Sequence, residues 1–171
     1  MRYQIKKFFL ELFYKKEIKN RLKKKFNKIS KNKPSIAVIV DSGLNLEVND
    51  FSFLSEIMNV SEDNIFFLWY ESLSVYHDSN HLGINIDDIS LTGKVNEEYA
   101  LFFNRKYDVL INLYQNNSIF IRSLSLKVNN VFSIGFTPVD LQLNDIVFDF
   151  SPKEIDILKR ELNKYTKIIF K

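Results

Sequence analysis

Seven polar residues at the ends of apolar runs are the positions in this sequence best suited to bind a ligand. The apolar runs are typical of buried strands, and the carboxyl ends of parallel strands meet at one edge of a sheet, where open α/β folds bind ligands. The candidate ligand-binding residues are Asp41, Ser42, Glu71, Asn112, Gln115, Asn116 and Thr137. All seven offer hydrogen bonds, but the pattern assigns no nucleophile, general base or oxyanion hole. The sequence therefore predicts no catalytic residue, and it leaves the ligand unknown.

Two of these residues also have a purely structural interpretation. Asp41 precedes Ser42 and Gly43, and an Asp and a Gly in this arrangement can simply shape a turn. Asn112 lies within a run predicted to be buried, where an unpaired amide costs about 1 to 3 kcal/mol. The structural alternative for Asn112 is a hydrogen bond to the neighbouring backbone.

The glycines are too few and too scattered to form a nucleotide-binding loop. They are Gly43, Gly83, Gly93 and Gly135. Neither G-x-G-x-x-G nor a Walker phosphate loop occurs, and no G-x-S-x-G nucleophile elbow is present. We therefore predict no cofactor. The sequence favours a non-catalytic protein, with a small enzymatic or ligand-binding α/β domain as the alternative.

Two histidines stand four residues apart, a spacing that on a helix would place both imidazoles on one face for a metal ion. They are His77 and His81, in the segment HDSNH. A metalloprotease helix would carry a glutamate directly after the first histidine, and the surrounding Ser, Asn and Gly indicate a loop instead. The chain also contains no cysteine, which excludes disulfides and thiolate zinc sites. We predict no metal site.

The charge is divided between two parts of the chain. Residues 1–33 hold 13 Lys and Arg against two acids, a net charge of +11, whereas residues 34–171 hold 11 against 19, a net charge of −8. This division predicts a basic, amphipathic helical arm at 1–33 and an acidic, Rossmann-like α/β domain at 34–171.

The arm contains neither Pro nor Gly from Arg2 to Ile29, which favours one long helix. Our first hypothesis is that its basic side chains contact RNA or the ribosome. The candidate nucleic-acid-binding residues are Lys19, Arg21, Lys23, Lys24, Lys25 and Lys28. A second hypothesis is attachment to an anionic membrane surface. The apolar residues for that contact are Phe8, Phe9, Leu12 and Phe13. The structural alternative is a helix docked on its own domain with a solvated lysine face.

The remaining elements follow from apolar runs and capping residues. The central unit at 107–136 is predicted to form a strand, a helix and a second strand. Further strands are predicted at 36–40, 65–70 and 145–150, with a short edge strand at 89–95. Helices are predicted at 51–58, 97–103 and 119–128, and a last helix is predicted from the capping pattern of Ser151, Pro152 and Glu154. The predicted fold is a three-layer α/β sandwich with a mostly parallel sheet of about five or six strands, preceded by the long basic helix.

No apolar run is long enough to span a membrane, and the N-terminal residues lack the pattern of a secretion signal. We therefore expect a cytoplasmic protein. The sequence does not predict an oligomeric state.

Several short motifs resemble those of a family of small bacterial cytosolic proteins known only as a domain of unknown function. The motifs are Leu110-Ile-Asn-Leu-Tyr114, Ile134-Gly-Phe136, Leu143-Asn-Asp-Ile146 and Glu161-Leu-Asn-Lys-Tyr165, together with the lysine-rich N-terminal helix. This resemblance implies no activity. Locally, Tyr107 to Phe136 is also similar to a segment in the N-terminal half of heptosyltransferase-like glycosyltransferases, which use a second Rossmann-like domain for the nucleotide sugar.

Overall fold

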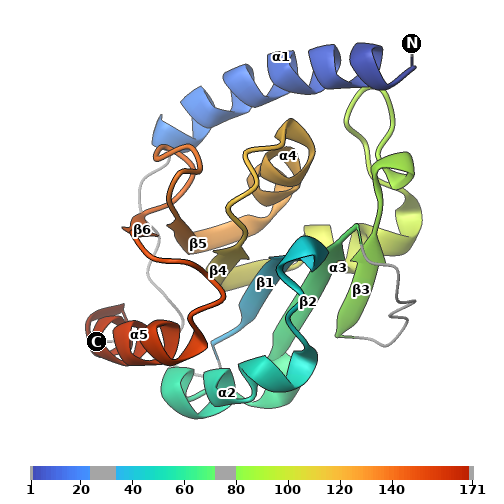
Figure 1. Cartoon of the computed structure of the whole chain (residues 1–171). Coiled ribbons are helices and arrows are strands. Elements are labelled where there is room, and N and C mark those ends of the chain that lie inside the picture. The colour runs from blue at the N-terminus through green and yellow to red at the C-terminus, as the bar shows by residue number, and fades with distance from the viewer. Residues whose placement is uncertain (1, 24–33, 72–79, 170–171) are drawn as a thin grey trace.

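The computed structural model describes residues 2–23, 34–71 and 80–169, which fold around a six-stranded sheet (Figure 1). The strands lie in the order β3-β2-β1-β4-β5-β6, and every neighbouring pair is parallel. Their bounds are β1 (Ile36–Asp41), β2 (Ile65–Tyr70), β3 (His81–Ile84), β4 (Lys106–Leu113), β5 (Asn129–Phe136) and β6 (Ile146–Phe148). The prediction of an α/β fold with a mostly parallel sheet is confirmed.

Strand β1 shows why the sheet is covered on both faces. Each residue of Ile36–Val40 is fully buried. Because successive side chains of a strand point to opposite faces, Ala37 and Ile39 belong to one hydrophobic cluster, whereas Ile36, Val38 and Val40 belong to the other. A continuous apolar run is the pattern expected of a central parallel strand.

The helices form layers on both sides of this sheet (Figure 1). One face is covered by α2 (Phe53–Met58) and α5 (Ile155–Ile169). The other is covered by α3 (Ala100–Asn104) and α4 (Ile119–Lys127). The long helix α1 (Arg2–Lys23) lies over α4, so this side of the sheet carries two layers of helix.

Helix α4 has apolar residues on nearly every side. Its outer side, which faces away from the sheet, is not left in solvent because α1 covers it. The buried α1 residues Leu10, Tyr14 and Ile18 belong to the same cluster as Phe120 and Leu124 of α4. The arm is thus a helix docked on its own domain, which was the structural alternative for this segment.

The edge strand predicted at 89–95 is wrong. Ile89 and Val95 instead form a single antiparallel bridge at the base of a tight turn. The turn is closed by a hydrogen bond from Ser90 N to Lys94 O of 2.7 Å, and Gly93 adopts a positive φ of 79° that favours glycine. The edge strand beside β2 is instead β3, which begins at His81, a residue that we expected to lie in a loop.

Helix α5 begins at Ile155, later than the capping pattern predicted. Ser151 and Pro152 precede the helix in a turn closed by a hydrogen bond from Glu154 N to Ser151 O. The strand predicted at 145–150 is shorter, Ile146–Phe148, and the helix predicted at 51–58 begins at Phe53 after a 3₁₀ turn at Val48–Phe51.

Candidate functional site

The order of the strands reverses between β1 and β4, at the centre of the sheet. The chain after β1 leads to α2 on one face, and the chain after β4 leads to α4 on the other. In parallel sheets, ligands bind at the carboxyl ends of strands beside such a point. At this edge, the Asp41 carboxylate accepts a hydrogen bond from Gly43 N at 2.9 Å and so caps the turn after β1. The Ser42 hydroxyl is buried and has no hydrogen-bond partner among the described residues.

Three further predicted residues at the same edge make hydrogen bonds within the protein. Gln115 Nε2 donates to Thr137 O at 2.8 Å, which ties the end of β4 to the end of β5. Thr137 Oγ1 donates to Asp149 Oδ1 at 2.7 Å. Asn116 Oδ1 accepts from Ser118 N at 3.0 Å, just before α4. The side chains of Gln115, Asn116 and Thr137 therefore already have hydrogen-bond partners within the protein.

Glu71 follows β2 and adopts an uncommon backbone conformation, with a positive φ of 55°. Its backbone N–H donates to Ile84 O at 2.8 Å, and its side chain is exposed. Burial and the neighbouring Glu71 carboxylate raise the pKa of Tyr70 above its usual range. Glu71 thus places a negative charge beside the buried Tyr70 hydroxyl.

Asn112 lies in the interior rather than at the edge, with 1% of its surface exposed. Its Nδ2 donates to Asn144 Oδ1 at 2.7 Å, and its Oδ1 accepts from Ser125 Oγ at 2.9 Å. Ser125 Oγ also lies 2.7 Å from the buried Tyr114 hydroxyl. The partners of the Asn112 side chain are other side chains, so the structural alternative of a hydrogen bond to the neighbouring backbone is wrong. Sequence reasoning missed Asn144 and Ser125 as its partners.

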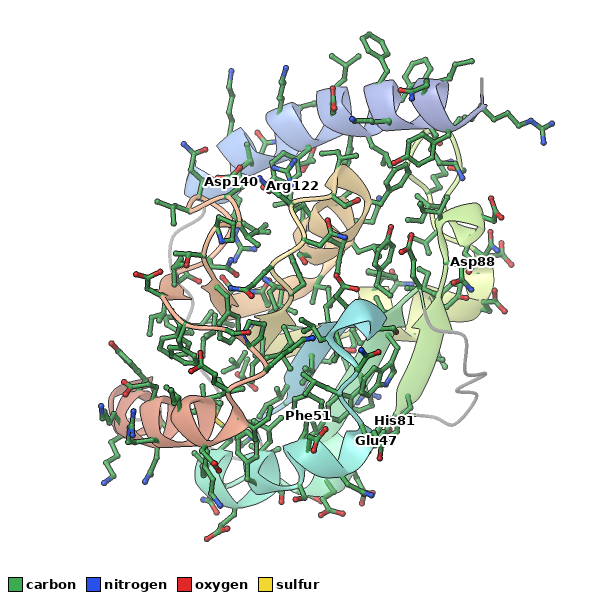
Figure 2. The ribbon with its side chains drawn as sticks, in the orientation of Figure 1. Glu47, Phe51, His81, Asp88, Arg122 and Asp140 are labelled. Carbon is green, nitrogen blue, oxygen red and sulfur yellow. The ribbon has the colours of Figure 1, made fainter. Side chains whose placement is uncertain are left out.

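The inner face of α1, which comprises Leu10, Tyr14, Ile18 and Arg21, attaches the helix to the domain. Tyr14 donates a hydrogen bond to Asp140 Oδ2 at 3.0 Å, and the Arg122 guanidinium lies over the Tyr14 ring, 4.6 Å from its centroid. Figure 2 shows Arg122 and Asp140 together beneath α1. Burial, followed by the Asp140 carboxylate, raises the pKa of Tyr14 above its usual range.

Arg21, a candidate for nucleic-acid binding, points to the domain. Its guanidinium donates to Ser133 Oγ at 2.6 Å and to Asn130 Oδ1 at 3.2 Å. The guanidinium also lies 3.7 Å from Asp145 Oδ2, and burial lowers the Arg21 pKa. With 19% of its side chain exposed, Arg21 joins α1 to β5 rather than presenting its charge to solvent.

The outer face of α1 carries an apolar half and a basic half. Ile5, Phe8, Phe9 and Leu12 are exposed and follow the helical spacing of three, four and seven residues. Lys15, Lys16 and Lys19 are exposed and continue the same spacing beyond Leu12. Figure 2 shows side chains projecting from α1 away from the rest of the molecule. We refer to these seven residues as the outer face.

The other arm residues named by the sequence are placed differently. Phe13 is partly buried, with the Lys127 ammonium 4.5 Å from its ring centroid. Lys23 belongs to α1, whereas Lys24, Lys25 and Lys28 lie outside the described residues. Of the four apolar residues proposed for membrane contact, Phe8, Phe9 and Leu12 are thus available to a partner.

His77 also lies outside the described residues, so the histidine pair cannot be placed as a unit. His81 stacks on Phe67 with the ring centroids 4.8 Å apart. Within 2–23, 34–71 and 80–169, no group of three or more His, Cys, Asp or Glu side chains is arranged to hold a metal ion. None of the helices described there is long and apolar enough to cross a membrane.

Comparison with known proteins shows a family but no activity. The family model described as "Family of unknown function (DUF6913)" matches residues 6–169. No curated protein matches the chain. Among solved structures, the glycosyltransferase SnogD from Streptomyces nogalater is similar, with 15% identity and a TM-score of 0.32 over 85% of this chain. The chain spans 41% of the length of that protein.

Proposed function

The chain belongs to DUF6913, a family of unknown function, and we propose that it is a non-catalytic interaction protein that docks through the outer face of α1. The proposed partner is a surface that bears many phosphate groups, a chemistry shared by ribosomal RNA and by anionic membranes. The observation that carries the proposal is that Lys15, Lys16 and Lys19 are exposed although α1 is packed on the domain. The inner face of α1 packs on the domain, so the basic half of the outer face remains exposed to a partner.

The distribution of charge over the molecule supports this orientation. α1 and α2 lie on opposite sides of the sheet, and α2 is at the far edge of the molecule from α1 (Figure 1). Exposed acids gather around α2, and they are Glu47, Asp50, Glu56, Glu62 and Asp63. A phosphate-bearing surface attracts the lysines of α1 and repels the acids around α2, so docking through α1 turns these acids toward solvent.

The test compares two triple variants that remove the same charge. The first, Lys15→Gln, Lys16→Gln and Lys19→Gln, neutralises the basic half of the outer face. The control, Lys153→Gln, Lys159→Gln and Lys167→Gln, neutralises three exposed lysines before and on α5, across the sheet from α1. Both are mixed with ribosomes and with vesicles that contain phosphatidylglycerol, and bound protein is separated by sedimentation or flotation over a series of salt concentrations.

The wild type and the control should bind at least one of the two surfaces, and more weakly as salt rises. The outer-face variant should lose about 100-fold in affinity, since each lysine near an anionic surface contributes about 1 kcal/mol. Absence of binding to both surfaces at low salt, or equal binding by the two triple variants, would contradict the proposal. Substitution is preferred to removal of residues 1–33 because that deletion would expose the residues beneath Leu10, Tyr14 and Ile18.

A second candidate function is small-ligand binding at the carboxyl edge of the sheet. The observation that favours it is the buried Ser42 hydroxyl at the end of β1, which has no hydrogen-bond partner in the part of the chain that the structure describes. The other residues of this proposal are Asp41, Glu71, Gln115, Asn116 and Thr137. Metabolite and nucleotide mixtures should raise the melting temperature of the wild type and raise that of Ser42→Ala less. No stabilisation by any mixture would count against this candidate.

A further inference from the structure

We infer that the phosphate-bearing partner of the outer face is an anionic lipid membrane, with the apolar half of α1 inserted and the basic half at the lipid phosphates. This inference rests on the proposed function and adds the identity of the surface. It comes from the position of the apolar half relative to the lysines.

The apolar half is unusual because four large side chains of one helix face are left in solvent. The exposed fractions are 42% for Ile5, 56% for Phe8, 47% for Phe9 and 50% for Leu12. Phe8 and Phe9 contact each other, with ring centroids 5.8 Å apart. The domain does not cover these residues because α4 packs against the opposite side of α1, at Leu10, Tyr14 and Ile18.

A lipid surface suits this composition better than RNA does. RNA offers phosphates to lysines and bases to aromatic rings, but it has no large aliphatic surface to receive Ile5 and Leu12. The boundary between headgroups and acyl chains receives aliphatic and aromatic side chains alike, and a helix lying in this plane buries its apolar face by about 5 to 10 Å. All four apolar side chains gain from transfer into such an environment.

The lysines stand where the lipid phosphates would be. Lys15, Lys16 and Lys19 follow Leu12 on the same face of α1. At a rise of about 1.5 Å per residue, their centre lies roughly 12 Å along the helix from the centre of the apolar half. A helix with this sequence of side chains lies at a slant, with its N-terminal half deeper in the bilayer and its C-terminal half at the headgroups.

The domain presents this face as a preformed helix. Near the N-terminus, Lys6 Nζ donates to Ile86 O at 2.8 Å, and the rings of Tyr3 and Phe120 lie 5.2 Å apart. Near the end of the helix, Arg21 is bound to Ser133 and Asn130. Since α1 is held at both ends, membrane binding requires no folding of the helix, and the domain takes one orientation on the surface.

The test uses flotation with vesicles of phosphatidylglycerol and phosphatidylcholine and with vesicles of phosphatidylcholine alone. Phe8→Ser removes one apolar side chain of the outer face. Leu101→Ser, the matched control, removes one on α3 that is 85% exposed. Phe8→Ser should lower binding to the anionic vesicles about tenfold or more, whereas Leu101→Ser should bind as the wild type does. Neutral vesicles should bind the wild type weakly, because the lysines then lack a partner.

A fluorescent reporter measures insertion directly. The native Trp69 is 2% exposed in the core and should not respond to lipid. Phe8→Trp should shift its emission to the blue and be quenched by brominated acyl chains, whereas Leu101→Trp should do neither. Binding to ribosomes but not to anionic vesicles, or equal effects at positions 8 and 101, would overturn the membrane inference and leave the proposed function standing. If neither ribosomes nor vesicles bind, both fail.

Discussion

Asn112 of β4 donates a hydrogen bond of 2.7 Å to the side chain of Asn144, in the loop that precedes β6. Asn144 in turn lies directly against Gly135 of β5, leaving no room there for a Cβ atom. Three of the short motifs that resemble the family therefore meet at one place: Leu110–Tyr114, Ile134–Phe136 and Leu143–Ile146. A buried amide pair of this kind fixes how the loop 137–145 packs on the sheet, so the motifs have a structural explanation.

Gly135→Ala should destabilise the fold because the new Cβ would overlap the buried Asn144 amide. We expect a loss of about 1 to 3 kcal/mol in the free energy of unfolding, measured by urea titration. The control is the same substitution in an Asn144→Ala background, where the overlapping group is gone. If Gly135→Ala costs as much in that background as in the wild type, the steric explanation is wrong.

Asn112→Ala should also destabilise the fold, by about 1 to 3 kcal/mol, because it leaves Asn144 Oδ1 and Ser125 Oγ with fewer partners in the interior. Asn117→Ala provides a matched control at an exposed position just after the same strand, and should change stability by less than about 0.5 kcal/mol. Equal unfolding midpoints for the two variants would show that the buried network does not contribute to stability.

The strands that contain long apolar runs could be predicted from the sequence, and the short strand β3 could not. β2 was predicted residue for residue, since Ile65–Tyr70 contains only β-branched, aromatic and leucine side chains. β3 was missed because its four residues include His81 and Gly83 and show no alternation. Its place in the sheet comes from pairing with β2, through contacts such as Leu68 with Leu82.

The start of α5 illustrates a limit of capping patterns. Glu154 Oε2 does accept a hydrogen bond from Ser151 N at 2.8 Å, as in a capping box, but this bond closes a turn and the helix begins after it.

The buried side of α1 could not be predicted from the sequence, since apolar residues occur around much of the circumference of this helix. Contact with α4 buries Leu10 and Tyr14 and leaves Phe8 and Phe9, on the opposite side of α1, exposed. The partner of Asn112 was missed because Asn144 is 32 residues away.

Arg21→Ala should loosen α1 from the domain because it removes the hydrogen bonds to Ser133 and Asn130 and the ion pair with Asp145. Hydrogen bonds to a charged group contribute about 1.5 to 3 kcal/mol each, so we expect a loss of that order in stability and faster amide exchange in α1. Lys19→Ala, at an exposed position of the same helix, is the control and should change neither. An Arg21→Ala variant that is as stable as Lys19→Ala but binds ribosomes less well would instead assign Arg21 to RNA.

Alkaline pH should unfold the protein cooperatively, beginning near the ordinary tyrosine pKa of 10.0. Burial raises the pKa of five tyrosines in the folded state, and these are Tyr14, Tyr70, Tyr99, Tyr107 and Tyr114. Above pH 10 the unfolded chain releases these protons while the folded chain keeps them. The stability contributed by each tyrosine is therefore complete below its unfolded pKa and is lost as pH rises, by up to about 1.4 kcal/mol per pH unit.

Lys127 acts in the opposite direction, because burial lowers its pKa in the folded state, so its contribution to stability improves as pH rises toward its ordinary pKa of 10.5. One lysine does not offset five tyrosines, and the net effect above pH 10 is destabilising. Thermal melts at stepwise increasing pH measure this loss, and the part of the tyrosinate absorbance that belongs to these five of the eight tyrosines should rise together with the loss of helical circular dichroism. Tyr107→Phe, which removes the hydroxyl bonded to Phe102 O, should make stability fall less steeply above pH 10. If tyrosinate equivalent to all eight tyrosines of the chain forms while the melting temperature and the circular dichroism stay constant, the five buried tyrosines titrate without unfolding and their burial does not control alkaline stability.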